Sequence, residues 1–161
     1  MLAIAGFVLS LASCLSTQSL PKVDRIVIEK GKHTMSLLDG AKVVKSYKVA
    51  LGGHPEGAKD RQGDHKTPEG VYFVDAKKPS SQFHKALHVS YPNQADRERA
   101  KKLGLNPGGD IEIHGLGAKW GWVGAAHRET DWTDGCIAVT NGEIDEIYPL
   151  IEVGTPVEIK P

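Results

Sequence analysis

The sequence has no excess of either charge, few cysteines and no apolar run long enough to cross a bilayer. Lys and Arg together number 20, as do Asp and Glu, so the formal net charge is zero. A neutral chain has no bulk field to hold a polyanion, which argues against nucleic acid as a partner. The apolar run from Leu2 to Leu11 is too short to span a bilayer comfortably.

Glycine and proline, by contrast, are abundant. The 161 residues include 18 glycines and 9 prolines, which imply many turns and favour a β-rich fold over a helical bundle. A chain of this length suits one domain with a real core.

Residues 1–20 are predicted to be a signal peptide or a lipoprotein leader. The stretch Leu11-Ala12-Ser13-Cys14 resembles a bacterial lipobox, in which the cysteine is lipidated, although no Lys or Arg precedes the apolar run. A plain secretory signal and an uncleaved anchor are the alternatives. We therefore expect residues 21–161 to form a domain exported to the periplasm or cell envelope. Its membrane contact would come only through a lipid on Cys14.

Alternation of apolar and polar residues predicts mostly strands after this leader. Strands are expected around residues 26–28 and 35–37, with a hairpin turn at Asp39-Gly40 and a return strand over 43–51. Later strands are expected near residues 71–76, 85–92, 111–114, 137–139 and 157–159. One or two short helices are expected, over 93–104 and after the capping box that starts at Thr140. Residues 52–70 and 115–130 are predicted to be long loops.

Cys136 is the residue whose role the sequence leaves open. If Cys14 is lipidated or removed, Cys136 has no intramolecular partner, and an exported unpaired thiol is either a buried apolar residue or a nucleophile. A nucleophilic cysteine needs a base or a lowered pKa. His114 is the best-placed candidate base, because it ends a predicted strand just before a glycine-rich loop.

Several motifs together resemble the catalytic domain of YkuD-type L,D-transpeptidases. They are "GDHKTPEGVY" at 63–72, "IHG" at 113–115 and "TDGCIAVTN" at 133–141. The resemblance implies a mainly β, sandwich-type fold and acyl transfer on peptidoglycan stem peptides, with no metal or cofactor. It implies that Cys136 forms a thioester, that His114 is the base, and that the N–H groups of Gly135 and Cys136 bind the oxyanion.

We expect the domain to act as a monomer. Further residues are expected to contact substrate or to orient the site. Asn141 fits the signature, although helix capping explains it equally well. The glycine-rich loop with Trp120, Trp122 and Trp132 is expected to form a lid. The predicted substrate-binding residues are Thr133, Asp134, Gly115, Asn141, Trp122 and Arg128.

Three departures from the family pattern keep alternatives open. Asp134 stands where relatives carry histidine, Ala138 stands where many carry arginine, and the loop from His114 to Thr133 is slightly longer. A cation for the substrate would then come from elsewhere, such as Arg128, Lys119 or Arg61. The alternatives are a hydrolase of the same family, acting as an L,D-carboxypeptidase or releasing a wall-linked protein, and an inactive wall-binding lipoprotein. A metal site of His114, His127, Asp134 and Cys136 is disfavoured, because these residues lack the closely spaced ligand pairs of zinc motifs.

Overall fold

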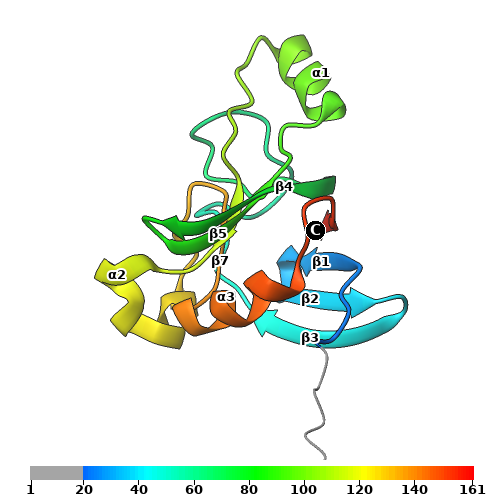
Figure 1. The fold of residues 1–161 in the computed structure, drawn as a ribbon. Coiled ribbons are helices and arrows are strands. Elements are labelled where there is room, and N and C mark those ends of the chain that lie inside the picture. The colour runs from blue at the N-terminus through cyan, green and yellow to red at the C-terminus, as the bar shows by residue number, and fades with distance from the viewer. Residues whose placement is uncertain (1–19) are drawn as a thin grey trace, which may run out of the picture.

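The computed structural model describes residues 20–161 (Figure 1). Apart from Leu20, the expected leader and its lipidation site, Cys14, lie outside these residues. Within residues 20–161, no helix is long and apolar enough to cross a membrane.

The expected meander at the start of the domain is confirmed. It consists of β1 (Arg25–Glu29), β2 (Thr34–Asp39) and β3 (Lys42–Lys48), and each strand is antiparallel to the next. The turn between β2 and β3 falls at the expected Asp39-Gly40, and Gly40 has φ of 59°, which glycine adopts at little cost.

Within residues 20–161, eight strands form one curled sheet, which confirms the expected mainly β fold. Their order is β3-β2-β1-β8-β4-β5-β6-β7. The strands beyond the meander are β4 (Gly70–Ser81), β5 (His84–Val89), β6 (Glu112–His114), β7 (Ile137–Ala138) and β8 (Pro156–Lys160). β8 lies parallel to β1, although it is last in the chain.

The sheet curls at β4, which belongs to both of its halves. Residues 70–73 of β4 pair with β8, and residues 74–81 pair with β5. The two halves share one apolar core, because the alternate side chains of their strands are buried together. Fully buried members of that core include Ile26 and Ile28 of β1, Leu87 and Val89 of β5, and Ile113 of β6.

The described part of the chain also contains three short α-helices, one more than the upper expectation. α1 (Gln94–Leu103) and α3 (Asn141–Ile147) begin at capping boxes on Asn93 and Thr140, as the sequence predicts. Figure 1 shows α1 at the opposite end of the molecule from α3. The third helix, α2, was not expected.

The prediction of an irregular loop over residues 115–130 is wrong. This segment contains α2 (Gly117–Trp120) and the 3-10 segment Gly121–Glu129, which is kinked at Gly124. Its glycines suggested a loop, but the Oδ1 atom of Asn141 accepts the N–H groups of Leu116 and Gly117 and so satisfies the start of the helix. Two shorter 3-10 turns are Lys30–Lys32 and Tyr148–Leu150.

Candidate active site

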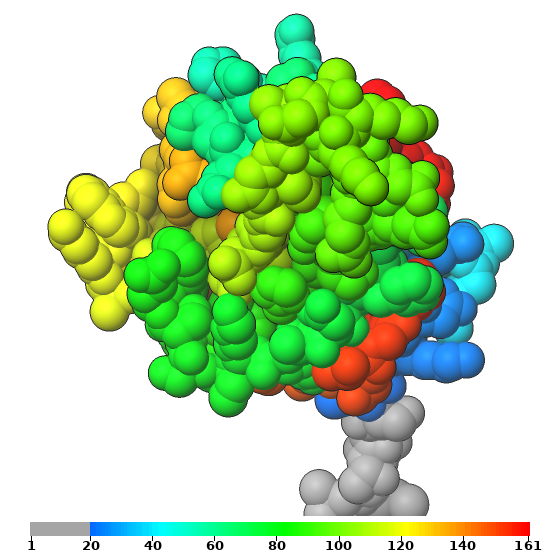
Figure 2. All heavy atoms as spheres, turned by 90° about the horizontal axis from the view of Figure 1, so that it is seen from above, coloured from blue at the N-terminus to red at the C-terminus, as the bar shows by residue number. Residues whose placement is uncertain are grey.

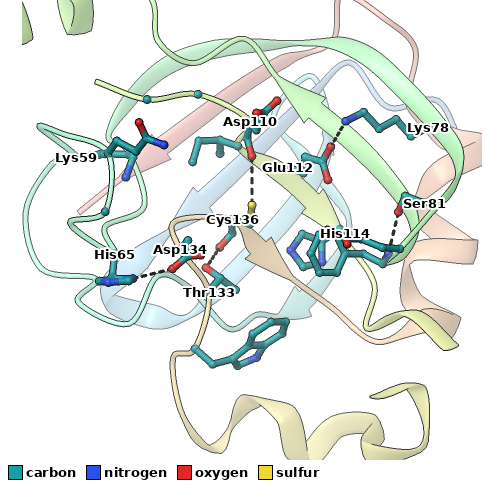
Figure 3. Close-up of a pocket in the computed structure, with 18 residues that line it drawn as sticks. Lys59, His65, Lys78, Ser81, Asp110, Glu112, His114, Thr133, Asp134 and Cys136 are labelled. Carbon is teal, nitrogen blue, oxygen red and sulfur yellow. Dashed lines mark hydrogen bonds and ion pairs between the residues drawn. The ribbon is translucent and has the colours of Figure 1, made fainter. Parts of the chain in front are cut away.

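The parallel pairing of β6 and β7 brings the two predicted catalytic side chains to one face of the sheet. Its register places Ile113 beside Ile137 and His114 beside Ala138. Side chains alternate along a strand, so Cys136 points to the same side as His114, and Ile113 and Ile137 point to the core. Figure 3 shows Cys136 and His114 side by side along the wall of one cleft.

The cleft has a volume of about 810 Å³ and receives side chains from four separate parts of the chain. These are the loop before β4, the β4–β5 hairpin, β6 with the residues before it, and the turn before β7. Its lining residues are Lys59, Gln62, Gly63, His65, Lys78, Ser81, Gln82, Phe83, Gly108, Gly109, Asp110, Ile111, Glu112, His114, Trp132, Thr133, Asp134 and Cys136.

His114 is held in one tautomer and kept neutral. It is 1% exposed, and burial lowers the pKa of its imidazole. Its Nδ1 lies 2.6 Å from the carbonyl oxygen of Gly115, so Nδ1–H donates and Nε2 is left as the basic nitrogen. The ring stacks on Phe83 with 4.2 Å between centroids and meets the edge of Trp132. This arrangement suits a general base.

Cys136 is half-buried and protonated in the free protein. Burial raises the pKa of its thiol to about 11, and the carboxylates of Glu112 and Asp134 contribute to the rise. The Sγ atom donates to the carbonyl oxygen of Asp110 at 3.5 Å. The pair is therefore a neutral thiol and a neutral imidazole, so the thiol proton must pass to a base as the sulfur attacks.

The turn before Cys136 is fixed by Thr133 and Gly135. The Thr133 hydroxyl donates to the Cys136 carbonyl oxygen at 2.8 Å and accepts the Gly135 N–H at 3.1 Å. Thr133 lines the cleft but is only 4% exposed, and both bonds of its hydroxyl orient the turn. The N–H of Gly135 is occupied by the same bond, which leaves the N–H of Cys136 as the better oxyanion donor in this conformation.

Asp134 forms a hydrogen bond with His65 at the rim of the cleft. Its carboxylate lies 2.7 Å from Nδ1 of His65, and its side chain is 88% exposed (Figure 3). An exposed pair of this kind contributes little to stability. Asp134 lines the cleft and is exposed to solvent, and its contact with substrate stays a prediction.

Gly115 and Asn141 lie outside the cleft lining, and both support the site from behind. A Cβ atom on Gly115 would lie 2.7 Å from Oδ1 of Asn141 and 2.8 Å from the carbonyl oxygen of Phe83. Asn141 caps the start of α2, and Thr140 caps α3. The expected substrate contact is corrected to a positioning role for both residues.

Trp122 and Arg128 also lie outside the cleft lining. Trp122 is 80% exposed on the segment that contains α2, which projects from the body of the molecule in Figure 2. Arg128 is paired with Glu143 of α3. The structure thus places both residues away from the cleft that contains Cys136, and of the three tryptophans only Trp132 lines that cleft.

The sequence did not single out the charged residues that surround Cys136. Lys59, Lys78 and Glu112 all line the cleft, and Lys59 and Glu112 are almost fully buried. Burial of a charged side chain is uncommon unless it is paired, and no local pattern reveals it. The only available signal was the alternation of "IEIH", which places Glu112 and His114 on one face.

The alternative of a metal centre receives no support. Among residues 20–161, no group of three His, Cys, Asp or Glu side chains is placed to hold a metal ion.

Comparison with known proteins identifies the family. The sequence profile of the L,D-transpeptidase catalytic domain, YkuD, matches residues 23–159. The chain is 34% identical over 133 residues to YafK of Escherichia coli K12, which is named as a candidate L,D-transpeptidase. That match covers 78% of this chain and 46% of YafK, so the chain spans about half the length of the curated relatives it matches.

Solved structures share the fold. The helical cell shape determining protein Pgp2 from Campylobacter jejuni is 26% identical, with a TM-score of 0.66 over 86% of this chain and 48% of that chain. An L,D-transpeptidase from Mycobacterium smegmatis is 16% identical, with a TM-score of 0.56 over 84% of this chain and 58% of its own, and shows the fold alone. The protein therefore belongs to the family of L,D-transpeptidase catalytic domains.

Proposed function

We propose that this chain is a cysteine acyltransferase of peptidoglycan, an L,D-transpeptidase that forms a thioester on Cys136 with a stem tetrapeptide. The observation that carries the proposal is the neutral His114, whose Nδ1–H is anchored to the Gly115 carbonyl oxygen beside the Cys136 thiol. A base fixed in this tautomer next to a half-buried thiol is the arrangement that nucleophilic acyl transfer needs.

The reaction starts when Sγ of Cys136 attacks the carbonyl carbon between the L-centre of the diamino acid and the terminal D-amino acid. Nε2 of His114 takes the thiol proton as the C–S bond forms. The N–H of Cys136 stabilises the oxyanion. The intermediate then collapses, His114 returns the proton to the leaving amine, and D-alanine departs. An amine from a second stem peptide resolves the thioester by forming a cross-link.

Water can resolve the same thioester, which would make the protein an L,D-carboxypeptidase or an enzyme that releases a wall-linked protein. The half-reaction at Cys136 is common to these outcomes and to transfer. We place the reaction in the periplasm or cell envelope, where peptidoglycan lies, with Cys14 as the proposed lipid anchor. The likeness to Pgp2, a cell shape determining protein, supports a role in wall remodelling.

Product analysis on purified muropeptides tests the proposal. We expect the wild-type protein to consume tetrapeptide stems and to yield either cross-linked dimers or tripeptide stems with free D-alanine. Cys136→Ala should abolish both products without unfolding the protein, whereas Cys14→Ala is the matched control and should retain them. Turnover by Cys136→Ala would refute the thiol mechanism. A wild-type protein that is inert, yet has an alkylatable Cys136, would favour the inactive wall-binding lipoprotein.

A further inference from the structure

The cleft contains lysines that the proposed reaction has not yet used. Arg128 is paired with Glu143, and Lys119 and Arg61 do not line the cleft. The lysines that line it are Lys59 and Lys78. Figure 3 shows them on opposite sides of Cys136, with Lys78 at the end nearer His114. Each is therefore a candidate partner for an anionic group of the substrate.

Lys59 is buried, yet most of its hydrogen-bonding capacity is unused. Its side chain is 3% exposed, and within residues 20–161 its one side-chain hydrogen bond goes to Oδ1 of Asp64, at 2.7 Å. An ammonium group has three N–H donors, so two remain for a ligand. A buried cation also attracts an anion more strongly than an exposed one, because less water screens the charge.

The carboxylate of Asp64 is shared among several donors, which weakens its interaction with the Lys59 ammonium. Besides the ammonium, it accepts the backbone N–H groups of Asp60, Arg61 and Lys66. The three backbone bonds tie together the loop before β4. The shared carboxylate leaves the ammonium able to bind a second anion.

Lys78 is a weaker candidate. Its side chain is 45% exposed, so water screens its charge. Its ammonium binds Glu112, whose side chain is 8% exposed and accepts no other hydrogen bond among the described residues. One lysine is thus matched by one buried carboxylate, which leaves little attraction for another anion.

We propose that Lys59 is a substrate-specificity residue that binds a carboxylate of the donor stem peptide. The inference rests on the proposed function, since it concerns the donor of that reaction. Two groups of a stem peptide offer this chemistry: the α-carboxylate of the terminal D-amino acid, and the side-chain carboxylate of the diamino acid where it carries one. Donors with free carboxylates are then preferred over their amides.

Matched donors and paired substitutions test this inference. Three donors are compared by kcat/KM: the free acid, the C-terminal carboxamide, and the donor amidated on the diamino acid. One charge-assisted hydrogen bond corresponds to roughly a 10- to 100-fold preference for the free acid over one of the amides. Lys59→Met combined with Asp64→Asn removes both charges of the pair and should abolish that preference. Retention of the preference by this double variant would overturn the inference.

Asp64→Asn alone is the matched control. It keeps the ammonium and removes the competing carboxylate, so the preference for the free acid should stay or increase. A fall would overturn the inference even if the double variant failed to fold. Lys78→Met should leave the preference for the free acid unchanged. If this variant lost the preference, the carboxylate would bind at the Lys78 end of the cleft and the inference would be overturned.

Binding to Cys136→Ala separates failure of this inference from failure of the proposed function. Calorimetry with the three donors measures the carboxylate preference without turnover. A Lys59-dependent preference in binding, with no turnover by the wild-type protein, would support the carboxylate site and refute the reaction. Turnover of all three donors at equal rates would refute the carboxylate site and support the reaction.

Discussion

Replacing Gly135 by alanine should destabilise the protein through a clash at the turn that presents Cys136. Gly135 has φ of 129°, a backbone conformation that residues with a Cβ atom rarely adopt. A Cβ atom there would lie 2.5 Å from the carbonyl oxygen of Lys66 and 3.1 Å from Cδ1 of Ile111. The first contact is with backbone, which cannot rotate away as a side chain can.

The expected loss in the free energy of unfolding is the sum of two separate costs. Holding a non-glycine residue at this φ costs about 1–3 kcal/mol. Overpacking against a fixed neighbour costs about another 1–3 kcal/mol. Gly135→Ala should therefore lower the free energy of unfolding by about 2–6 kcal/mol. Gly154 is the matched control, because its φ of 96° is also unfavourable for alanine but a Cβ atom there would have nothing within 4 Å.

Urea denaturation of both variants measures the difference. Gly154→Ala should show the backbone cost alone, and Gly135→Ala should be less stable than Gly154→Ala by about 1–3 kcal/mol, with similar m-values. If the two variants lost the same stability, the close approach of Lys66 to the turn would not be a constraint. The account of how the turn is built would then be wrong.

Three further predictions concern charge and support around the cleft. Glu112→Gln should lower the pKa of Cys136, because a carboxylate that raises it is removed; iodoacetamide labelling should then shift to lower pH, and an unshifted profile would contradict this. Asp64→Asn should destabilise the protein most at neutral pH. Burial raises the pKa of Asp64, but Lys59 and three backbone N–H groups outweigh burial and lower this pKa to about 2. The contribution of Asp64 to stability is therefore lost as pH falls from about 4 to 2. Denaturation of wild type and variant at pH 7 and pH 2 measures this contribution, and equal losses of stability at both pH values would refute the prediction. Asn141→Ala leaves two N–H groups at the start of α2 without their acceptor and should speed hydrogen exchange there, with unchanged exchange as the contrary result.

The strands and two of the helices followed from the sequence because their signals are local. Alternation of apolar and polar residues predicted the strands, and Asp39-Gly40 predicted the hairpin. The capping boxes at Asn93 and Thr140 predicted α1 and α3. The helix α2 depends on the amide of Asn141, which lies 24 residues away from Gly117. Nothing near residue 117 signals such a partner, so the segment was predicted to be a loop.

The candidate site likewise has residues that local sequence patterns predict and residues that depend on long-range contacts. Cys136 and His114 were identified from their motifs, and the β6–β7 register explains why they meet. Their sequence neighbours Thr133, Gly115 and Asn141 were expected to contact substrate. The Thr133 and Asn141 side chains bond to backbone instead, and the Gly115 carbonyl oxygen accepts the Nδ1–H of His114. Buried lysines such as Lys59 could not be identified, because long-range pairing decides whether a charge is buried.

Mass spectrometry of the acyl-enzyme tests the central claim most directly. The wild-type protein is mixed with a stem tetrapeptide, quenched in acid and digested. The account predicts a mass increase equal to the tripeptide acyl group on the peptide that contains Cys136, together with one equivalent of D-alanine. Release of D-alanine by Cys136→Ala, or an acyl group found on any other residue, would contradict it.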